Sequence, residues 1–533
     1  MHGRIRNICG WTIIELLFNW ENIKTGITFG WLLPSLRNIF CQKKTLNIVY
    51  RYGIVDLPQS LLINTTLYKY FYYLCGDYLL NIRCSIMLLS AKFENIYSFN
   101  EETRILFTAS KSDQLPLHVL RAEKRDDISV LRMGLIYGAN ASGKSNIIKC
   151  LAIIKAFALN GWSNRKYNYF KMTDNPQERS SIELEFKVND QFLAYGVAFS
   201  KGGLLEEWLY KTGSRNDAMI FERKRSGNDW ENVIAPQFMK EEGGQFLKYL
   251  IDGTPTKGTF LSEYIERNGK GIDAIKLARK WFENLNIIFP ETHRTDFPFR
   301  VVSDAQFRTV MRELLGYFGT GISDLCRVES KPEELSIPDE IRQKIEENLE
   351  GKDEKTGVVI HNESRFLFAE KDESKNLKWY ELKTIHKKEG SVSDYIFEMF
   401  EESDGTSRLF DFIPMLIDMR ANDAVYVIDE VDRSLHPMLT LKLLEMYNSL
   451  LRSNSQMQLV CTTHESNLLS TAPVRQDEIW FVEKDKKGES HLSSLCEYKP
   501  RENVQKGYLN GRYGAIPFFG ELDNIHWDDA KQE

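Results

Sequence analysis

Residues 131–151 read LRMGLIYGANASGKSNIIKCL and contain the full pattern G-x-x-x-x-G-K-[ST] at 138–145. The residues before the pattern, 133–137, are short and apolar enough for a buried strand, and those at 144–154 have helical spacing. Backbone N–H groups in a glycine-rich loop, together with the positive end of the following helix, surround a phosphate group. We therefore expect a nucleotide site made by Gly138, Ala139, Asn140, Ala141, Ser142, Gly143, Lys144 and Ser145, called the phosphate loop below.

Two side chains of the phosphate loop carry the chemistry. Lys144 is expected to reach the β- and γ-phosphates, and the Ser145 hydroxyl is expected to lie on Mg²⁺. An eight-residue pattern can arise by chance in a chain of this length, so the assignment also depends on motifs further along the chain.

The composition is that of an ordinary globular protein. The 533 residues predict two to four domains, and 42% hydrophobic with 27% charged residues is a typical balance. A net charge of −6 does not indicate general nucleic-acid binding, although a local basic groove stays open. No apolar run is long enough for a membrane span, and the N-terminus lacks the features of a secretory signal. The eight cysteines form no C-x-x-C pair, which favours reduced thiols and a cytoplasmic location.

Residues 1–86 differ from the rest of the chain. They hold nine Lys or Arg against four acidic residues, a charge of about +5, which leaves about −11 for residues 87–533. We considered a small accessory domain, a partner-binding extension, and upstream sequence translated from a start site placed too early. Met87 opens a strand-like run that resembles a natural beginning, and we favour the third explanation.

The periodicity of the remaining chain changes twice. Strand patterns occur at 182–188, 192–199, 204–209 and 218–224, and again at 357–368 and 377–386. Helical spacing occurs between them, at 238–251, 260–267, 274–285, 304–316 and 332–350. We therefore predict an α/β P-loop fold in which two halves of a nucleotide-binding core, 87–235 and 351–533, flank an inserted helical domain at 236–350.

A second part of the site follows the apolar strand predicted at 424–428, which ends in Asp429 and Glu430. Carboxylates at the carboxyl end of a parallel strand lie beside the phosphate loop. We expect Asp429 to hold Mg²⁺, directly or through water, and Glu430 to orient and deprotonate the attacking water. The alternative is a buried strand followed by two surface acids.

Two further segments complete the pattern. The apolar strand at 457–463 ends in His464, which fits a γ-phosphate sensor, although a histidine at a strand end is more often structural. The Ser/Gly-rich segment 403–407 opens the helix that leads to the Asp429 strand, and such a helix start is either an anion site or a simple capped turn. Lys144, Glu430 and His464 are the predicted catalytic residues.

In this order and spacing, the four pieces resemble the ABC-type ATPase heads of the SMC, RecF and OLD group, and most closely the RloA-like ATPases of abortive-infection loci. The resemblance covers most of 87–533 and none of 1–86. It is carried by ESDGTSRLF (402–410), VYVIDEVDRSLHP (425–437), QLVCTTHESNLL (458–469), DEIWFVEKD (477–485) and YLNGRYGAIPFF (508–519).

This resemblance implies ATP and Mg²⁺ as cofactors and a homo-oligomer in which the signature segment of one head, 402–410, closes on the nucleotide of another. The interface residues it implies are Ser403, Gly405, Thr406 and Asp432, with Ser403 and Gly405 on the γ-phosphate and His464 as the switch histidine. The signature reads Ser-Asp-Gly-Thr rather than the transporter-like Ser-Gly-Gly-Gln. No glutamine loop stands out, and Gln177 is a weak candidate.

OLD-type proteins append a TOPRIM nuclease to such a head, and residues 481–485 faintly resemble the start of one. A TOPRIM site needs later paired carboxylates as metal ligands, and the only adjacent acid pair after Asp485 is Asp528-Asp529. We therefore predict no nuclease in this chain. The resemblance instead implies an ATPase sensor that controls a separately encoded, nuclease-like effector and responds to a phage trigger protein or DNA, with no membrane partner.

Two other functions stay open. A DNA-repair or chromosome-maintenance head of SMC/RecF type would bind DNA directly in a basic groove, but the helical insert lacks the long heptads of an SMC arm. A nucleotide-locked scaffold would act by binding alone, and Glu430 and His464 argue against it.

Overall fold

The computed structural model describes residues 86–517, with gaps at 122–124, 126, 163–167, 174–178, 228, 241–242, 293, 295–296, 332–342, 344–356, 363–364, 372–376, 391–392, 453–454 and 501. The chain divides into two units, Met1–Ile82 and Arg83–Glu533. All of the described residues belong to the second unit. Three predicted features lie outside the described residues: the extension up to residue 85, the glutamine-loop candidate Gln177, and, except for Gln343, the helical segment 332–350.

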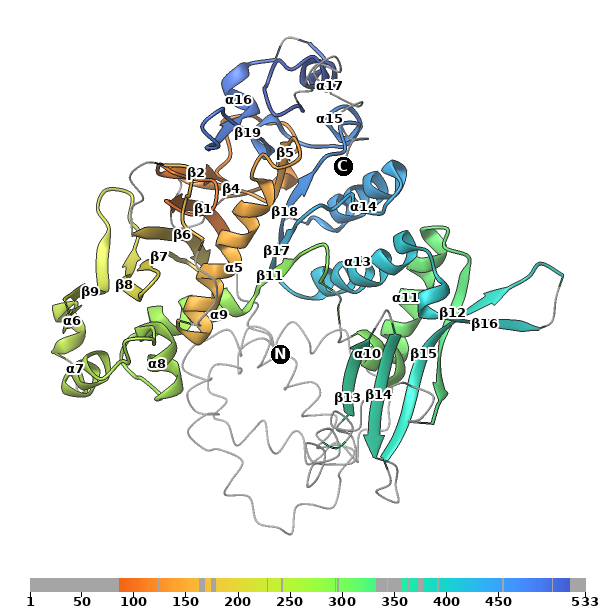
Figure 1. Cartoon of the computed structure of the whole chain (residues 1–533), viewed down its shortest axis with the longest axis horizontal. Helices are drawn as coiled ribbons and strands as arrows, with labels where there is room; N and C mark the ends of the chain where they lie inside the picture. Colours follow the sequence, from red (N-terminus) through yellow and green to blue (C-terminus); the bar gives the residue numbers. More distant parts are fainter. Residues whose placement is uncertain are drawn as a thin grey trace, which may run out of the picture. The chain divides into compact units, whose positions relative to one another are not determined.

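The phosphate loop follows an inner strand of a six-stranded sheet, called the core sheet (Figure 1). Its strand order is β11 (Leu285–Ile288), β17 (Val425–Ile428), β18 (Gln458–Thr463), β5 (Met133–Gly138), β19 (Ile479–Lys484) and β20 (Ser490–Ser494). All pairings are parallel except that of β20 with β19. Every residue of β5 is buried, as expected for a parallel strand covered on both faces. The predicted α/β P-loop fold is confirmed.

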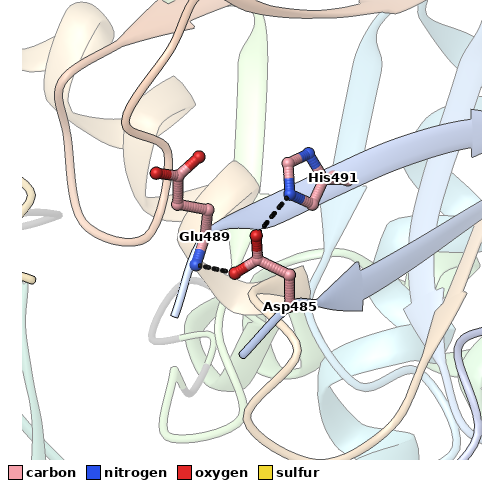
Figure 2. A group of neighbouring side chains, drawn as sticks. All are labelled: Asp485, Glu489 and His491. Carbon is pink, nitrogen blue, oxygen red and sulfur yellow. Dashed lines mark hydrogen bonds and ion pairs between the residues drawn. The ribbon is translucent and has the colours of Figure 1, made fainter. Parts of the chain in front are cut away.

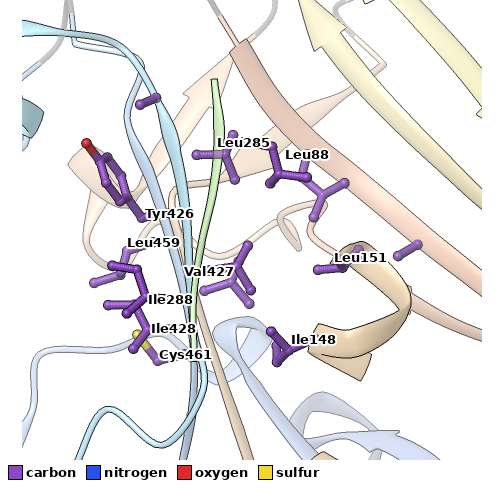
Figure 3. Packing of buried hydrophobic residues seen from close by; sticks show 14 of the residues in the cluster. Leu88, Ile148, Leu151, Leu285, Ile288, Tyr426, Val427, Ile428, Leu459 and Cys461 are labelled. Atoms are coloured by element: carbon purple, nitrogen blue, oxygen red, sulfur yellow. The ribbon is translucent and has the colours of Figure 1, made fainter. Parts of the chain in front are cut away.

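Helix α5 (Lys144–Asn160) starts directly after the phosphate loop and covers one face of the core sheet. Figure 3 shows Ile148 and Leu151 of α5 on the same side of the sheet as Val427 of β17. Tyr426 and Ile428, the neighbours of Val427, point to the opposite side, because successive side chains of a strand alternate between faces. The helical spacing after the loop therefore corresponds to a buried stripe on α5.

A seven-stranded antiparallel sheet contacts the core sheet. Its order is β10 (Asp229–Ile234), β9 (Ala218–Ser226), β8 (Gly203–Lys211), β7 (Gln191–Ser200), β6 (Ser180–Val188), β1 (Ile86–Glu94) and β2 (Thr103–Leu106). The four strand patterns predicted between 182 and 224 correspond to β6, β7, β8 and β9.

One buried side chain joins this sheet to the core sheet. Gln458, the first residue of β18, accepts a hydrogen bond from the backbone N–H of Leu88 at 2.7 Å. Its amide nitrogen donates to the carbonyl oxygens of Leu88 at 3.0 Å and Leu131 at 2.7 Å. Because Gln458 is fully buried, these bonds satisfy backbone groups that water cannot reach.

A third sheet precedes the signature segment. Its strands are β12 (Ile322–Glu329), β15 (Leu377–Lys387), β14 (Arg365–Lys371) and β13 (Gly357–Asn362) in that order, with β16 (Asp394–Glu398) paired to β15. The strand pattern predicted at 357–368 corresponds to two strands, β13 and β14, which pair antiparallel with each other.

The segment predicted to be helical, 236–350, contains helices and also two strands. The helices are α6 (Pro236–Met239), α7 (Gly244–Asp252), α8 (Phe260–Glu266), α9 (Asp273–Glu283), α10 (Phe297–Ser303) and α11 (Ala305–Tyr317). Strand β11 joins the edge of the core sheet beside β17, and β12 joins the third sheet beside β15. Both pairings are with distant parts of the sequence, so a local helical period could not reveal them. The domain boundaries themselves stay a prediction.

The remaining elements follow the signature segment or connect the sheets. They are β3 (Val119–Arg121), β4 (Ser129–Leu131), α13 (Asp404–Ala421), α14 (Pro437–Leu450), α15 (Leu468–Thr471), α16 (Leu495–Tyr498) and α17 (Val504–Leu509), with short 3-10 turns η5 (Pro116–His118), η7 (Met399–Glu401) and η8 (Gln476–Glu478). Within the described part of the chain, no helix has both the length and the apolar character needed to cross a membrane.

Candidate nucleotide-binding site

The backbone of the phosphate loop is sharply turned between β5 and α5. Ala141 and Gly143 both have positive φ, 62° and 115°. Gly143 also needs to be glycine for steric reasons, because a Cβ atom there would collide with the hydroxyl groups of Ser490 and Ser98. The glycine of the pattern is therefore required by the loop's own packing, before any nucleotide is considered.

Three side chains support the loop from beneath. The Ser490 hydroxyl lies 2.5 Å from the carbonyl oxygen of Ser142 and 2.7 Å from the Ser98 hydroxyl. Asn146, in the first turn of α5, donates to Ser98 Oγ at 2.8 Å. This support could not be predicted from the sequence, because Ser98 and Ser490 are 392 positions apart and belong to no motif.

The Lys144 side chain folds back over its own loop. Its ammonium group donates to the carbonyl oxygens of Gly138 at 2.8 Å and Ala139 at 3.0 Å. Burial lowers the pKa of Lys144 to about 8, and the negative charges of Asp429 and Glu430 oppose that shift. The predicted phosphate-binding cation and the predicted carboxylates therefore lie close enough to interact.

Asp429 and Glu430 follow β17, which is separated from β5 by β18. Asp429 is buried, and its Oδ1 accepts a hydrogen bond from the Thr462 hydroxyl at 2.6 Å. Its Oδ2 has no hydrogen-bond partner among the described residues, and oxygen atoms of this kind are the ligands that Mg²⁺ prefers. Asp429 and the half-buried Ser145 hydroxyl thus have the donor chemistry for Mg²⁺, and their role as its ligands stays a prediction.

Glu430 is half-buried and has φ of 51°, in the left-handed region that few non-glycine residues adopt. Its backbone N–H donates to the Thr462 hydroxyl at 2.7 Å. Its carboxylate lies 3.7 Å from the Arg433 guanidinium, which is itself half-exposed. Glu430 therefore has a fixed backbone and an accessible carboxylate.

His464 follows β18 and is exposed. Its backbone N–H donates to both carboxylate oxygens of Asp432, at 3.3 and 3.2 Å. Loss of part of its hydration and the positive charge of Lys144 lower the pKa of His464, which favours the neutral ring. Asp432 therefore has a role within its own chain, whereas the interface role implied by the resemblance stays a prediction.

The signature segment forms the start of α13. Ser403 caps this helix by accepting from the Thr406 N–H at 3.2 Å, and Ser403 itself is exposed. A Cβ atom on Gly405 would approach the carbonyl oxygen of Ser434 at 2.8 Å, so glycine permits close packing against the turn after Glu430. The helix start is a capped turn and is also open to a ligand, so both sequence interpretations remain compatible with it.

Glu402, just before the cap, anchors the signature segment to the third sheet. Its Oε1 lies 2.5 Å from the Thr384 hydroxyl and 2.8 Å from Nε2 of His386, both on β15. The Glu402 side chain is almost fully buried. The quoted motif includes Glu402, but its partners on β15 could not be identified from the sequence.

The stretch at 477–485 contains strand β19 of the core sheet, and tyrosines of the stretch that begins at residue 508 pack on this strand. Tyr508 and Tyr513 stack on Phe481 of β19, with ring centroids 5.7 and 5.2 Å apart, and Tyr508 also meets the edge of Tyr137 on β5. Strand β19 pairs parallel with β5, so the segment compared with a TOPRIM start is part of the nucleotide-binding sheet.

Figure 2 shows a further group of metal-ligand types: Asp485 and Glu489 on the turn between β19 and β20, and His491 in β20. Asp485 accepts backbone N–H bonds from Lys487 and Glu489, both at 2.9 Å, and lies 3.2 Å from the His491 ring. The Glu489 carboxylate points elsewhere and accepts from Asn100 at 2.9 Å. These hydrogen bonds close a tight turn, which explains why the three side chains lie close together.

Comparisons with known proteins agree with this geometry. A family model described as "AAA domain, putative AbiEii toxin, Type IV TA system" matches residues 135–236 and 335–470, together less than half of the chain. The two matched stretches contain the phosphate loop, the signature segment, Asp429, Glu430 and His464. A comparison with curated proteins gives no significant match.

Among solved structures, the chain resembles SMC heads. The SMC head bound to the C-winged helix domain of ScpA has a TM-score of 0.39 at 13% identity, covering 79% of this chain and 99% of that one. The SMC head domain from Thermotoga maritima has a TM-score of 0.32 at 15% identity, covering 76% and 98%. The Smc head with an extended coiled coil, bound to a ScpA domain derived from Pyrococcus furiosus, has 0.33 at 16%, covering 78% and 98%. Likeness at this level does not specify a function.

The site therefore combines the phosphate loop after β5 with a buried carboxylate, Asp429, and an accessible carboxylate, Glu430. Both carboxylates follow β17, which is separated from β5 by β18. The region matched by the family model includes all of these residues. On this geometry the chain contains a P-loop nucleotide-binding domain, and its two matched stretches are similar to a family of AAA domains.

Proposed function

We propose that this domain hydrolyses ATP, and the placement of Lys144, Asp429 and Glu430 is the observation that carries the proposal. Lys144 would exchange the carbonyl oxygens of Gly138 and Ala139 for phosphate oxygens. Bound Mg²⁺, on Ser145 and Asp429, would neutralise charge between the β- and γ-phosphates. Glu430 would accept a proton from the attacking water, because its carboxylate is accessible and its backbone is fixed.

The same proposal includes a second head. His464, with a neutral ring, would offer one N–H to the γ-phosphate. Ser403, Gly405 and Thr406 would reach the nucleotide of the partner head, since Ser403 is exposed at the N-terminus of an 18-residue helix. Asp432 would lie at the same interface. The protein would accordingly act as a homo-oligomer with ATP between its heads.

We further propose that the ATPase is the sensor and regulatory subunit of a bacterial anti-phage system in the cytoplasm. It would control a separately encoded, nuclease-like effector in response to a phage trigger protein or DNA. Two observations support this: the resemblance carried by the stretches between 402 and 519, and a family description that names a toxin–antitoxin system. Differential binding of ATP to open and closed assemblies would supply the switch.

The experiment compares wild-type protein with Glu430→Gln, and uses Glu445→Gln on the surface of α14 as a matched control. ATP turnover and mass photometry would be measured with and without the product of the neighbouring gene, and with and without DNA. We expect Glu430→Gln to lose turnover by about 10²- to 10⁴-fold, the usual contribution of a general base, while it still binds ATP. It should also accumulate as an ATP-bound oligomer that retains the partner protein.

Each outcome separates one part of the proposal from the others. Unchanged turnover in Glu430→Gln means that Glu430 is not the base. Normal turnover of the wild type with no partner bound, but with stimulation by DNA that weakens as salt rises, favours a DNA-maintenance ATPase. Tight ATP binding without turnover in the wild type indicates a scaffold that acts by binding alone.

A further inference from the structure

Thr462, near the end of β18, contacts three successive residues of the turn that follows β17. Its hydroxyl lies 2.6 Å from Oδ1 of Asp429 and 2.7 Å from the backbone nitrogen of Glu430. Its carbonyl oxygen accepts the N–H of Val431 at 3.0 Å. Thr462 is fully buried, so water does not compete for these bonds.

The direction of the two hydroxyl bonds follows from the chemistry of the partners. The Glu430 N–H can only donate, so the Thr462 oxygen accepts from it. The single hydroxyl proton then points to the Asp429 carboxylate, which can only accept when ionised. One side chain thereby fixes the rotation of the Asp429 carboxylate and the orientation of the Glu430 peptide at the same time.

This arrangement also explains the backbone of Glu430. The left-handed region is strained for a non-glycine residue, and the Glu430 N–H needs a partner that regular strand pairing does not provide. The Thr462 hydroxyl is that partner. Without it, the N–H would be orphaned and the turn would be free to relax toward a more common conformation.

We propose that Thr462 is a positioning residue for the proposed ATPase reaction, holding Asp429 with Oδ2 directed to Mg²⁺ and Glu430 directed to the attacking water. The inference rests on the proposed function for the water, and on the donor chemistry of Asp429 for Mg²⁺. Thr462 would act through these two residues, by its hydrogen bonds to the Asp429 carboxylate and to the Glu430 backbone. A valine in its place would keep the shape of the side chain and remove both hydroxyl bonds.

The test uses three variants. Thr462→Val removes the hydroxyl, and Thr462→Ser restores it. Thr440→Val is the matched control, because Thr440 on α14 is equally buried and its hydroxyl has no hydrogen-bond partner among the described residues. For each, nucleotide affinity is measured by calorimetry with Mg²⁺ and with chelator, kcat and KM by phosphate release, and the melting temperature by calorimetry.

We expect Thr462→Val to raise the Mg²⁺ concentration at which the tightening of ATP binding is half-maximal, and to lower kcat. Each change should be about 10- to 100-fold, which is the usual effect of removing a residue that orients a metal ligand. Affinity for ATP in chelator should not change, since the phosphate loop is intact. Thr462→Ser should recover most of both quantities, and Thr440→Val should match the wild type.

Two results would overturn the inference. Equal weakening of ATP binding with and without Mg²⁺, together with a lower melting temperature, would show that Thr462 serves only the fold. Unchanged Mg²⁺ dependence and kcat in Thr462→Val would show that the carboxylates need no positioning. If the wild type does not hydrolyse ATP, the proposed reaction fails, but the Mg²⁺ dependence of binding still decides the role of Thr462.

Discussion

The perturbed pKa of Lys144 makes nucleotide affinity depend on pH in a calculable way. Burial brings this pKa to about 8 in the nucleotide-free site. A bound triphosphate places additional negative charge beside the buried ammonium group, so the pKa of Lys144 rises when ATP binds. The complex then holds more protons than the free protein, and binding must weaken as pH rises through about 8.

The size of the effect follows from the fraction of Lys144 that is protonated before binding. With a pKa of about 8, this fraction falls from about 0.76 at about pH 7.5 to about 0.09 at about pH 9. If only the ammonium form binds ATP, affinity falls about eightfold over that range, which is about 1.3 kcal/mol. Proton uptake on binding should rise from about 0.2 to about 0.9 per nucleotide over the same range.

Titration calorimetry in two buffers with different ionisation enthalpies measures both the affinity and the proton uptake. Lys144→Arg is the control, because a guanidinium stays protonated throughout and its affinity, whatever its absolute value, should be flat with pH. Constant proton uptake in the wild type between these pH values would refute the reasoning. An affinity that falls equally in Lys144→Arg would assign the effect to another group.

Two other substitutions test the scaffold around the site. Gln458→Leu leaves three buried backbone groups without partners, so we expect it to lower the free energy of unfolding by about 3 kcal/mol or more, measured by denaturant unfolding. Glu402→Ala removes the acceptor shared by Thr384 and His386, so Ser403 loses its fixed position. We expect turnover to fall by about tenfold or more. The affinity for ATP, measured at a protein concentration low enough to keep the heads separate, should not change.

Both substitutions have surface counterparts. Gln306→Leu, on the exposed start of α11, should leave the free energy of unfolding nearly unchanged, and a similar value for Gln458→Leu would mean that the junction between the sheets can relax. Glu389→Ala, on the exposed turn after β15, should leave turnover unchanged. If Glu402→Ala also retains full turnover, the link from the third sheet to the signature segment has no part in the reaction.

The features that could be predicted from the sequence are those encoded by neighbouring residues. The phosphate loop and α5 were predictable because glycine spacing and a helical period lie within one short stretch. Strands β17 and β18 were predictable because each is a short apolar run that ends in polar residues. In each case, the residues that decide the local structure and the residues expected to carry the chemistry lie within one short stretch.

The features that could not be predicted depend on contacts between distant residues. Strand β11 continues a helical pattern in the sequence, and only its pairing with β17 shows that it is a strand. Ser490 supports the phosphate loop from the other end of the chain, and Thr462 meets Asp429 because β18 lies between β17 and β5. A lowered pKa of Lys144 likewise depends on burial that no motif reports.

Hydrogen bonds divide the proposed reaction machinery into two parts with different supports. The groups that act within one head are hydrogen-bonded to the core sheet: Lys144 to the end of β5, and the Asp429 carboxylate and the Glu430 backbone to Thr462 on β18. Ser403, which is proposed to act on a partner head, is instead tied through Glu402 to β15 of the third sheet. A change that moves the third sheet would therefore shift the signature segment and leave the nucleotide pocket of its own head intact. We expect partner proteins to alter turnover through the third sheet and to leave the affinity of single heads for ATP unchanged.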